Sequence, residues 1–323
     1  MLAILNRLVQ KLQSSSTQDI QRAIGIMFAA LVVSLASFGG YYYWDRYVHL
    51  DDKSPLERDI ERVEQAIHQD PHDPESRVAL AKNYLSKRMY KKALDQTSQV
   101  LSLYPEHEGA LLISGITHVR LNQPQAALDP LGRFIKLRKE RPMAGTDTAL
   151  EAACYYMGES YMKLNRPGEA IPALQAALLI SPTDADALYQ LGLAHQASGQ
   201  PRAALEQYHK AVRLVPNFSE AYTSMIDSYS ALEYPDYVAY AQGMQALCLK
   251  DYETALTHLE HAAQALPDFA PVFLGLGLTY ENMGKLQAAM TAMQRALELD
   301  SVGYAARYAH GRIQAALNSQ DEQ

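Results

Sequence analysis

Residues 191–216 read LGLAHQASGQPRAALEQYHKAVRLVP, and residues 276–300 read LGLTYENMGKLQAAMTAMQRALELD. Both stretches begin Leu-Gly-Leu, and both place a pair of alanines after a polar break. The residues they share are Gly, Ala and Leu, which decide how closely two helices approach. No nucleophile or metal ligand recurs with them. The repetition therefore predicts a packing role for these stretches rather than a catalytic one.

Small residues mark the same positions along most of the chain. An alanine follows each of six polar breaks, with a small residue twelve positions before it and an apolar residue seven positions after it. The three sets are Ala93, Ala127, Ala170, Ala204, Ala255 and Ala289; Ala81, Gly115, Gly158, Gly192, Gly243 and Gly277; and Val100, Phe134, Ala177, Ala211, Ala262 and Ala296. Three of the five steps between successive alanines are equal. A unit of about 34 residues, interrupted once by a short insertion and once by a longer one, therefore repeats.

This unit resembles the tetratricopeptide repeat, a helical hairpin with a large residue and Leu-Gly in its first helix and alanines around a large residue in its second. The pattern is filled by Leu188, Leu191, Gly192, Ala204, Tyr208, Ala211 and Pro216, and again by Phe273, Leu276, Gly277, Tyr280, Ala289, Met293 and Ala296. The resemblance covers residues 56–317. It implies an all-α fold in which about six hairpins form an α-solenoid over residues 56–318.

Single helices are expected at both ends of this solenoid. Residues 56–69 fit a lone second helix, and residues 302–317 fit a lone first helix with Gly311 at the small-residue position. Half-repeats of this kind shield the terminal apolar faces from water. Residues 319–323 are expected to form a disordered tail.

Two departures interrupt the repeat. Lys139 stands where a proline closes other units, so a helix over residues 133–141 is expected to run on. Its basic patch consists of Arg133, Lys136, Arg138, Lys139 and Arg141. The patch fits either a solvated helix or a surface for an acidic partner or lipid headgroups. The second departure adds Ser219–Tyr234, which we interpret as a degenerate first helix whose partner is missing or merged.

A membrane-spanning helix is predicted over residues 23–44. Ala23–Tyr43 carries no charge, and 21 helical residues span about 31 Å, close to the thickness of a bilayer core. The aromatic residues from Tyr41 to Trp44 fit an interfacial belt. A cleaved signal peptide is the alternative, and the long polar segment before the apolar run disfavours it. Residues 1–22 are expected to form an amphipathic tail, and residues 45–55 a linker.

Orientation follows from weaker signals. Three Lys or Arg residues lie near each end of the predicted span, so the count of positive charges is a tie. Net charge and the free amine favour a cytoplasmic N-terminus with the helical array on the outer, periplasmic side. The chain resembles single-span repeat proteins of the bacterial inner membrane, and that localisation is the expectation.

Composition excludes several classes of function. The net charge of −7 and the pI of about 5.8 disfavour nucleic-acid binding. Cys154 and Cys248 lie on separate predicted helices, and a disulfide is not expected. The pair His258 and His261 has no third ligand nearby, so no metal is expected. No nucleotide, cofactor or nucleophile motif occurs, so we expect neither an enzyme nor a small-molecule substrate.

The resemblance implies that first helices line a concave groove that takes peptides, helices or protein subunits. The candidate groove residues are Lys82, Leu112, Ile116, Arg120, Tyr155, Glu159, Met162, Tyr189, Tyr237, Tyr240 and Met244. Tyrosine suits recognition because it offers a large contact area with a polar end, although each of these tyrosines could instead pack between hairpins. The positions that bind an acidic chaperone tail in the family hold other residues here, which disfavours that ligand.

The sequence therefore predicts a non-enzymatic, membrane-anchored scaffold that binds a partner protein during assembly or stabilisation of a membrane or envelope complex. A permanent structural subunit of a large membrane complex is the first alternative. An enzyme with a site in the groove is the second alternative, and it is disfavoured because no catalytic motif supports it.

Overall fold

The computed structural model describes residues 17–44 and 54–321, and every regular element in these ranges is a helix. The expected all-α fold is confirmed. The chain forms two units, Met1–Arg62 and Val63–Gln323. Most of the predicted amphipathic tail and of the linker lies in residues 1–16 and 45–53, outside the described residues.

The first unit contains one long apolar helix, α2 (Thr17–Tyr43). Within it, Ile24–Tyr43 is long and apolar enough to cross a membrane, and none of its most apolar window is buried by the rest of the protein. A signal sequence near the N-terminus would meet the same criteria. The next helix, α3 (Pro55–Gln69), begins with a capping box in which Ser54 Oγ accepts from the Glu57 amide and Glu57 Oε2 accepts from the Ser54 amide.

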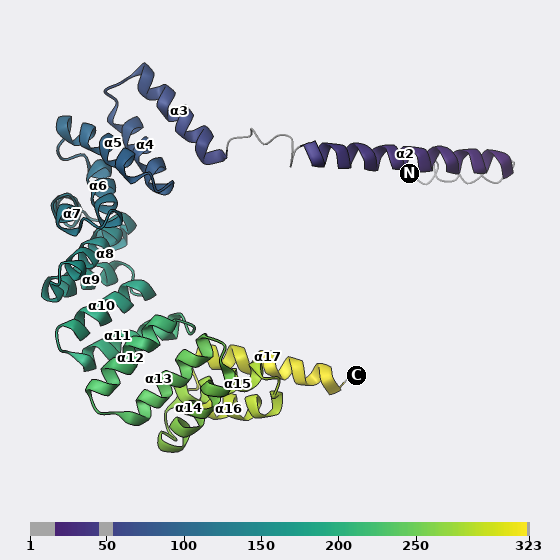
Figure 1. The fold of residues 1–323 in the computed structure, drawn as a ribbon, viewed down its shortest axis with the longest axis vertical. Coiled ribbons are helices and arrows are strands. Elements are labelled where there is room, and N and C mark those ends of the chain that lie inside the picture. The colour runs from purple at the N-terminus through teal and green to yellow at the C-terminus, as the bar shows by residue number, and fades with distance from the viewer. Residues whose placement is uncertain (1–16, 45–53, 322–323) are drawn as a thin grey trace. The chain divides into compact units, whose positions relative to one another are not determined.

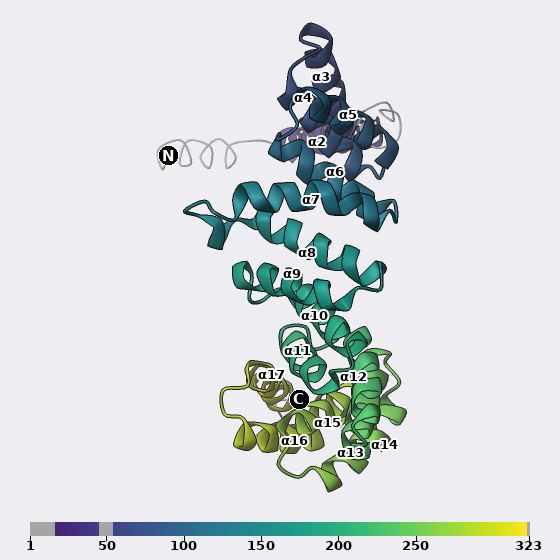
Figure 2. The same ribbon diagram turned by 90° about the vertical axis from the view of Figure 1, so that its left-hand side faces the viewer.

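The second unit contains the six predicted hairpins, stacked in chain order (Figures 1 and 2). The hairpins are α4 (Pro74–Ser86) with α5 (Tyr90–Leu103), α6 (Glu108–Arg120) with α7 (Pro124–Arg138), α8 (Thr148–Lys163) with α9 (Pro167–Ile180), α10 (Ala185–Ala197) with α11 (Pro201–Leu214), α13 (Pro235–Cys248) with α14 (Tyr252–Ala265), and α15 (Ala270–Asn282) with α16 (Leu286–Leu299). The remaining elements are η2 (Ala144–Thr146), α12 (Ser219–Ala231) and α17 (Tyr304–Asp321).

A glycine at the crossing of five hairpins meets a large side chain of the following helix. A Cβ atom added at any of these glycines would lie within 2.7 Å of that side chain, closer than real contacts allow. The pairs are Gly115 with Leu131, Gly158 with Leu174, Gly192 with Tyr208, Gly243 with Leu259, and Gly277 with Met293. The separation in sequence is the same in every pair. The predicted role of the repeated small residues is therefore confirmed.

The odd helix α12 has no hairpin partner of its own. The turn inside each regular hairpin contains one residue with positive φ, as at Asn165 between α8 and α9. Two such residues follow each other around α13, namely Glu233 after α12 and Lys250 before α14. Helix α13 therefore acts as the second helix of α12 and also as the first helix of α14. Of the two interpretations of Ser219–Tyr234, a merged partner is confirmed.

Sharing α13 exchanges the two layers of the stack. Alternate helices contact each other along a first layer of α4, α6, α8, α10 and α12, where Gly109 of α6 lies against Val78 of α4. A separate series of such contacts joins α13, α15 and α17, where Gly275 of α15 lies against Met244. We call this second series the switched layer. The switched layer lies on the same side of the stack as α11. The reason is that α13 follows α12 as a second helix, just as α11 follows α10.

Two predicted boundaries are wrong. Helix α7 ends at Arg138 rather than Arg141, since the Lys139 amide closes the helix on the Ile135 carbonyl and the inserted residues form a turn with the short helix η2. Helix α17 continues to Asp321, so residues 319–321 of the predicted tail are helical. Residues 322–323 lie outside the described residues.

Replacement of Gly192 by Ala should destabilise the array. The new Cβ would collide with the ring of the buried Tyr208, and overpacking of this kind costs about 1–3 kcal/mol. Gly168→Ala, on the open first turn of α9, is the matched control and should leave stability unchanged or raise it slightly. Urea unfolding followed by circular dichroism gives both values. Equal midpoints for the two variants would contradict the packing role of the crossing.

Candidate protein-binding surfaces

The first layer presents a mixed apolar and charged surface. Lys82 of α4 and Arg120 of α6 are exposed. Five further predicted groove residues on α6 and α8 are partly exposed: Leu112, Ile116, Tyr155, Glu159 and Met162. These seven side chains come from three successive first-layer helices, so they share one surface. We call it the first-layer surface.

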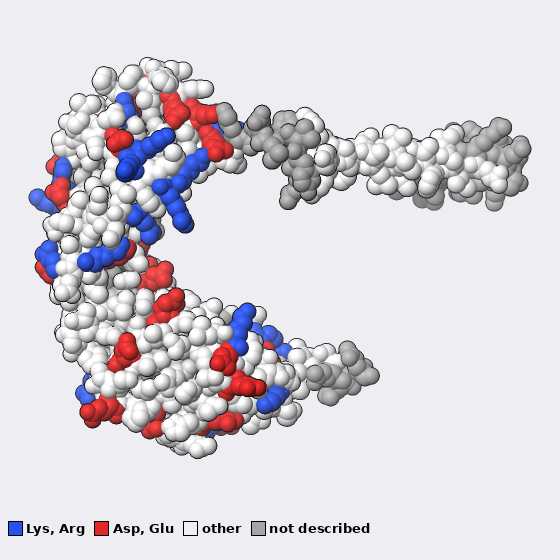
Figure 3. Space-filling view, viewed as in Figure 1, with Lys and Arg blue, Asp and Glu red and all other residues white. Residues whose placement is uncertain are grey.

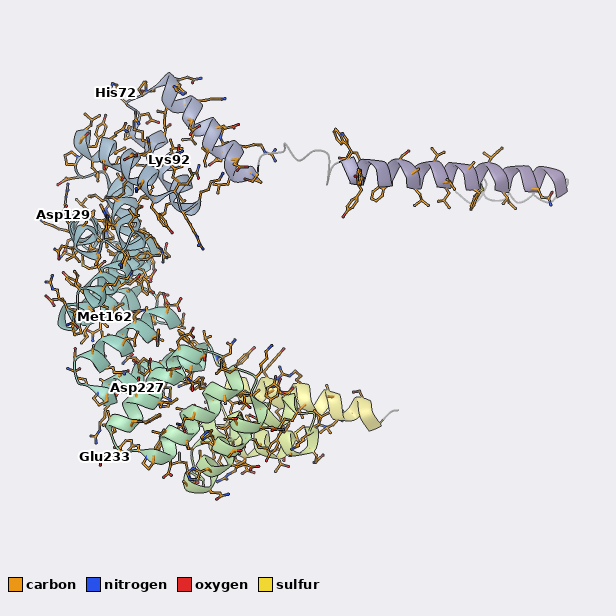
Figure 4. The ribbon with its side chains drawn as sticks, viewed as in Figure 1. His72, Lys92, Asp129, Met162, Asp227 and Glu233 are labelled. Atoms are coloured by element: carbon orange, nitrogen blue, oxygen red, sulfur yellow. The ribbon has the colours of Figure 1, made fainter. Side chains whose placement is uncertain are left out.

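Charge changes sign along this part of the protein. Lys and Arg side chains gather over α4 to α7, and Asp and Glu side chains gather further along, over α10 to α12 (Figure 3). The Arg120 guanidinium donates to Tyr156 Oη at 2.9 Å, whereas Glu159 pairs with Lys163 at 2.8 Å. Met162 on α8 and the exposed Asp227 on α12 mark the apolar middle and the acidic end (Figure 4).

Tyr189 packs between helices rather than facing an open groove. Its ring lies 4.9 Å from that of Phe218 and 5.8 Å from that of Tyr208. Its hydroxyl lies 3.4 Å from Ser224 Oγ of α12. The alternative interpretation of the groove tyrosines, in which they pack between hairpins, describes this residue.

Tyr237, Tyr240 and Met244 belong to a different surface from the other candidates. All three lie on α13, in the switched layer, whereas Tyr155 lies on α8 in the first layer. Tyr240 and Met244 are only 2% exposed. The repeat period correctly predicted that α13 is the first helix of a hairpin. Because α12 is a single added helix, however, the first helices after it lie in the other layer of the stack.

A cavity of about 380 Å³ lies where the switched layer meets α11. Tyr222, Tyr240, Met244 and Leu274 provide much of its apolar wall. Arg213 of α11 and Asp300, just before α17, supply the charged groups. The Tyr222 hydroxyl donates to the Pro216 carbonyl at 3.3 Å, and the Asp300 carboxylate accepts from the Val302 amide at 3.2 Å. This volume lies within the range of ligand pockets.

An aromatic cluster adjoins the cavity and shares His209 and Tyr240 with its lining. The ring of Phe269, in the turn before α15, lies 5.0 Å from Tyr240, 5.2 Å from Tyr237 and 6.2 Å from His209. His209 Nε2 lies 2.6 Å from the Tyr229 hydroxyl. Burial lowers the pKa of His209 to about 4, because the charged imidazolium would lose its hydration there. His209 is therefore neutral in the folded protein at neutral pH.

The predicted basic patch is largely paired with acidic groups. Arg138 donates to Glu108 and to Asp147, each at 2.7 Å, and Arg141 also pairs with Glu108. Arg133 pairs with Asp129 at 3.5 Å, and Lys139 with Glu140 at 3.7 Å. Hydrogen bonds from Arg138 and from backbone amides of α8 lower the pKa of Asp147, although burial opposes them. Arg138 therefore links the two helices of its own hairpin, through Glu108, to the start of the next hairpin, through Asp147.

Phe269, His209 and Arg213 were absent from the sequence-based site. The residues around them in the sequence look like those of any other repeat. The only sequence signal of a change of layer is the spacing from Gly192 to Gly243, which is the longest between successive crossing residues. Among the described residues, no cluster of His, Cys, Asp and Glu has a geometry that could hold a metal ion. Cys154 and Cys248 are free thiols.

Comparison with protein families identifies the repeat. Models described as "TPR repeat" and "Tetratricopeptide repeat" match residues 158–199, 185–218 and 270–302. The matched segments are tetratricopeptide repeats. These three matches cover the end of α8 through α11 and the last full hairpin, and the hairpins of α6 with α7 and of α13 with α14 have the same crossing geometry.

Two curated proteins and one solved structure show distant similarity to this chain. Anaphase-promoting complex subunit 3 of Schizosaccharomyces pombe is 23% identical over 78% of this chain and 34% of its own length, and the BBSome complex member BBS4 homolog of Drosophila melanogaster is 24% identical over 46% and 36%. This chain spans about a third of the length of these relatives. The crystal structure of YrrB, described as a TPR protein with an unusual peptide-binding site, is 22% identical with a TM-score of 0.48, over 66% of this chain and 96% of YrrB. No partner follows from similarity at this level.

Acidification should destabilise the tetratricopeptide-repeat unit through His209. The unfolded imidazole has its ordinary pKa of 6.5, so between pH 6.5 and 4 the unfolded chain binds a proton that the folded one does not. Stability is therefore lost as pH falls through this window, by about 3 kcal/mol at its lower end. His209→Gln should remove one proton from the pH dependence of unfolding, and the exposed His261→Gln should not. Equal pH dependence in both variants would refute this assignment.

Proposed function

We propose that this chain is a membrane-anchored scaffold whose tetratricopeptide repeats bind a segment of a partner protein at the first-layer surface. The observation that carries the proposal is the arrangement of that surface. Apolar side chains on α6 and α8 accompany the basic residues Lys82 on α4 and Arg120 on α6, and the acidic Asp227 lies further along the first layer on α12 (Figure 4). A matching partner presents an apolar stretch with acidic residues on one side and basic residues on the other.

A binding role suits this surface better than a catalytic one. Apolar contacts supply the affinity, while charges at the two ends set the direction in which a partner lies. The curated relatives are named as a subunit and a member of multiprotein complexes, which agrees with a role in assembly. We propose that the partner belongs to a membrane or envelope complex because α2 has the length and composition of a membrane span.

The proposed orientation places the N-terminus in the cytoplasm and the repeat unit on the outer side of a bacterial inner membrane. The apolar helix α2 supports the anchor, and the aromatic pair Tyr41 and Trp44, with ring centroids 6.4 Å apart, stands at its end as an interfacial belt would. A permanent subunit of a membrane complex remains the second candidate, since the same surface would serve a lasting contact.

Membrane attachment should depend on α2. The full chain is expected to stay in the membrane fraction after alkaline carbonate extraction, because about 30 Å of uncharged helix matches the bilayer core. Val33→Arg together with Leu35→Arg should release it, while Val33→Ala with Leu35→Ala should not. Protease added to spheroplasts should then digest the repeat unit. Full protection until the membrane is permeabilised would overturn the proposed orientation, and a shortened N-terminus by mass spectrometry would favour a signal peptide.

Partner contact should be confined to the first layer. A photoreactive residue in place of Met162 on α8 should crosslink to a defined protein. The same residue in place of Leu179 is the matched control, because this exposed apolar side chain lies on α9 in the other layer. Charge reversal by Lys82→Glu with Arg120→Glu should raise the dissociation constant about tenfold, at about 0.7 kcal/mol for each charge. Crosslinks of equal yield from both positions would refute the assignment of the surface.

Purification separates the two candidate roles. A permanent subunit should copurify with one partner in a fixed ratio and survive high salt. An assembly factor should copurify with less than one partner per chain, and the contact should weaken as salt screens the charged ends.

A further inference from the structure

Helix α17 has the register of a first helix, and it is the last helix of the described residues. Gly311 lies one repeat length after Gly277, the crossing glycine of α15. In α15 the face around Gly277 is covered by Met293 of α16. The corresponding face of α17 is a stripe at helical spacing formed by Tyr304, Tyr308, Gly311 and Ala315.

This stripe is uncovered. Tyr304 is 78% exposed, Tyr308 is 62% exposed, and Gly311 and Ala315 are exposed as well. Outside its own turn of helix, no atom of the described residues lies within 4 Å of a Cβ built at Gly311. Each of the other five crossing glycines has a large side chain against it. The stripe on α17 therefore corresponds to the faces that, in the five earlier hairpins, are covered by the following helix.

The stripe is complementary to itself in the antiparallel direction. Its large residues, Tyr304 and Tyr308, precede its small residues, Gly311 and Ala315. The pair Tyr308 with Gly311 and the pair Tyr304 with Ala315 share one midpoint, between Ala309 and His310. A two-fold axis at this midpoint therefore sets each tyrosine of one copy against a small residue of the other.

The chain already contains this contact between a tyrosine and a glycine. In the antiparallel hairpin of α10 and α11, the ring of Tyr208 fills the space beside Gly192 and is fully buried. Burial of a ring at a glycine crossing lets two helices approach within about 8–10 Å. The same geometry is available twice in a symmetric pair of α17 helices.

We propose that α17 is a homodimer interface, in which a second copy of this chain packs its own α17 antiparallel against the stripe. Tyr308 of each copy lies against Gly311 of the other, and Tyr304 lies against Ala315. No charged residue belongs to the stripe itself, and Arg307, which borders it, donates to the Val302 carbonyl of its own copy at 3.0 Å.

Neighbouring contacts hold the stripe ready for docking. The rings of Tyr304 and Tyr308 are nearly parallel, with centroids 6.3 Å apart. Arg312 lies 5.6 Å from the Tyr308 ring and donates two hydrogen bonds of 2.6 Å to Glu281 of α15. The flanking charge of Arg312 is therefore neutralised within each copy, and its guanidinium restricts the position of the Tyr308 ring.

The decisive variant fills the glycine position without harming the monomer. Gly311→Leu enters open space in one copy and improves helix propensity, so monomer stability should be unchanged or higher. In the dimer the new side chain collides with Tyr308 of the second copy, and the dissociation constant should rise at least tenfold. Gln314→Leu, on the flank of the same helix, is the matched control and should keep the dimer. Sedimentation of the full chain in detergent measures both.

Disulfide trapping tests the direction of pairing. Differently tagged copies with Tyr308→Cys and Gly311→Cys should form a mixed disulfide under mild oxidation, whereas a mixture of Tyr304→Cys and Tyr308→Cys should not. The native thiols should not interfere, because burial raises the pKa of Cys154 and of Cys248 to about 11.

The two measurements define what overturns the proposal. A full chain that stays monomeric across the concentration range, or a dimer that Gly311→Leu leaves intact, would refute it. A stripe shielded within a monomer by another segment of the chain would refute it too. A mixed disulfide between the control pair, in place of the expected one, would refute the antiparallel register.

Discussion

The structure depends on one contact repeated in five hairpins, in which a glycine of a first helix receives a large side chain of the second. The absence of a Cβ lets the two backbones approach, and the large side chain then fills the crossing so that no cavity remains. Tyr208 against Gly192 and Leu174 against Gly158 are two forms of this contact. A single hairpin cannot bury its outer apolar stripe, so each one becomes stable only when the next stacks on it.

That constraint explains what one extra helix does to the surface. Successive helices alternate between the two layers. An added pair of helices would therefore lengthen the stack and leave each layer on its own side. Helix α12 comes alone, and α13 must serve two partners. The layer of first helices therefore moves to the side of α11, where Phe269, His209 and Tyr240 pack together and a cavity lies between α11 and the start of α17. The array thus has two chemically different surfaces.

The limits of sequence-based reasoning follow from the range of the interactions involved. Hairpins and their crossings depend on pairs of residues at one fixed, short separation in sequence, so the period of Ala and Gly predicted them correctly. Tyr240 has the right phase for a first helix, but its exposure depends on α11 and on Phe269, whose side of the stack no local pattern encodes. The pairing of the basic patch could not be predicted for a similar reason, since Glu108, which pairs with Arg138, lies 30 residues earlier at the start of α6. The groove assignment on α4, α6 and α8 remains a prediction about binding.

Attachment to a membrane would affect how strongly two copies of the chain pair through α17. Four stripe residues on one helix form a small contact compared with the roughly 1,200–2,000 Å² of a stable interface, so the dimer is expected at the upper end of the concentration range in detergent rather than in dilute solution. Attachment to a membrane would confine copies to a surface and raise their effective concentration, which strengthens a weak contact without any new one. Two copies joined through α17 would also present two first-layer surfaces to one partner complex. A partner with two matching segments would then bind more tightly than one segment allows, provided that its geometry reaches both surfaces.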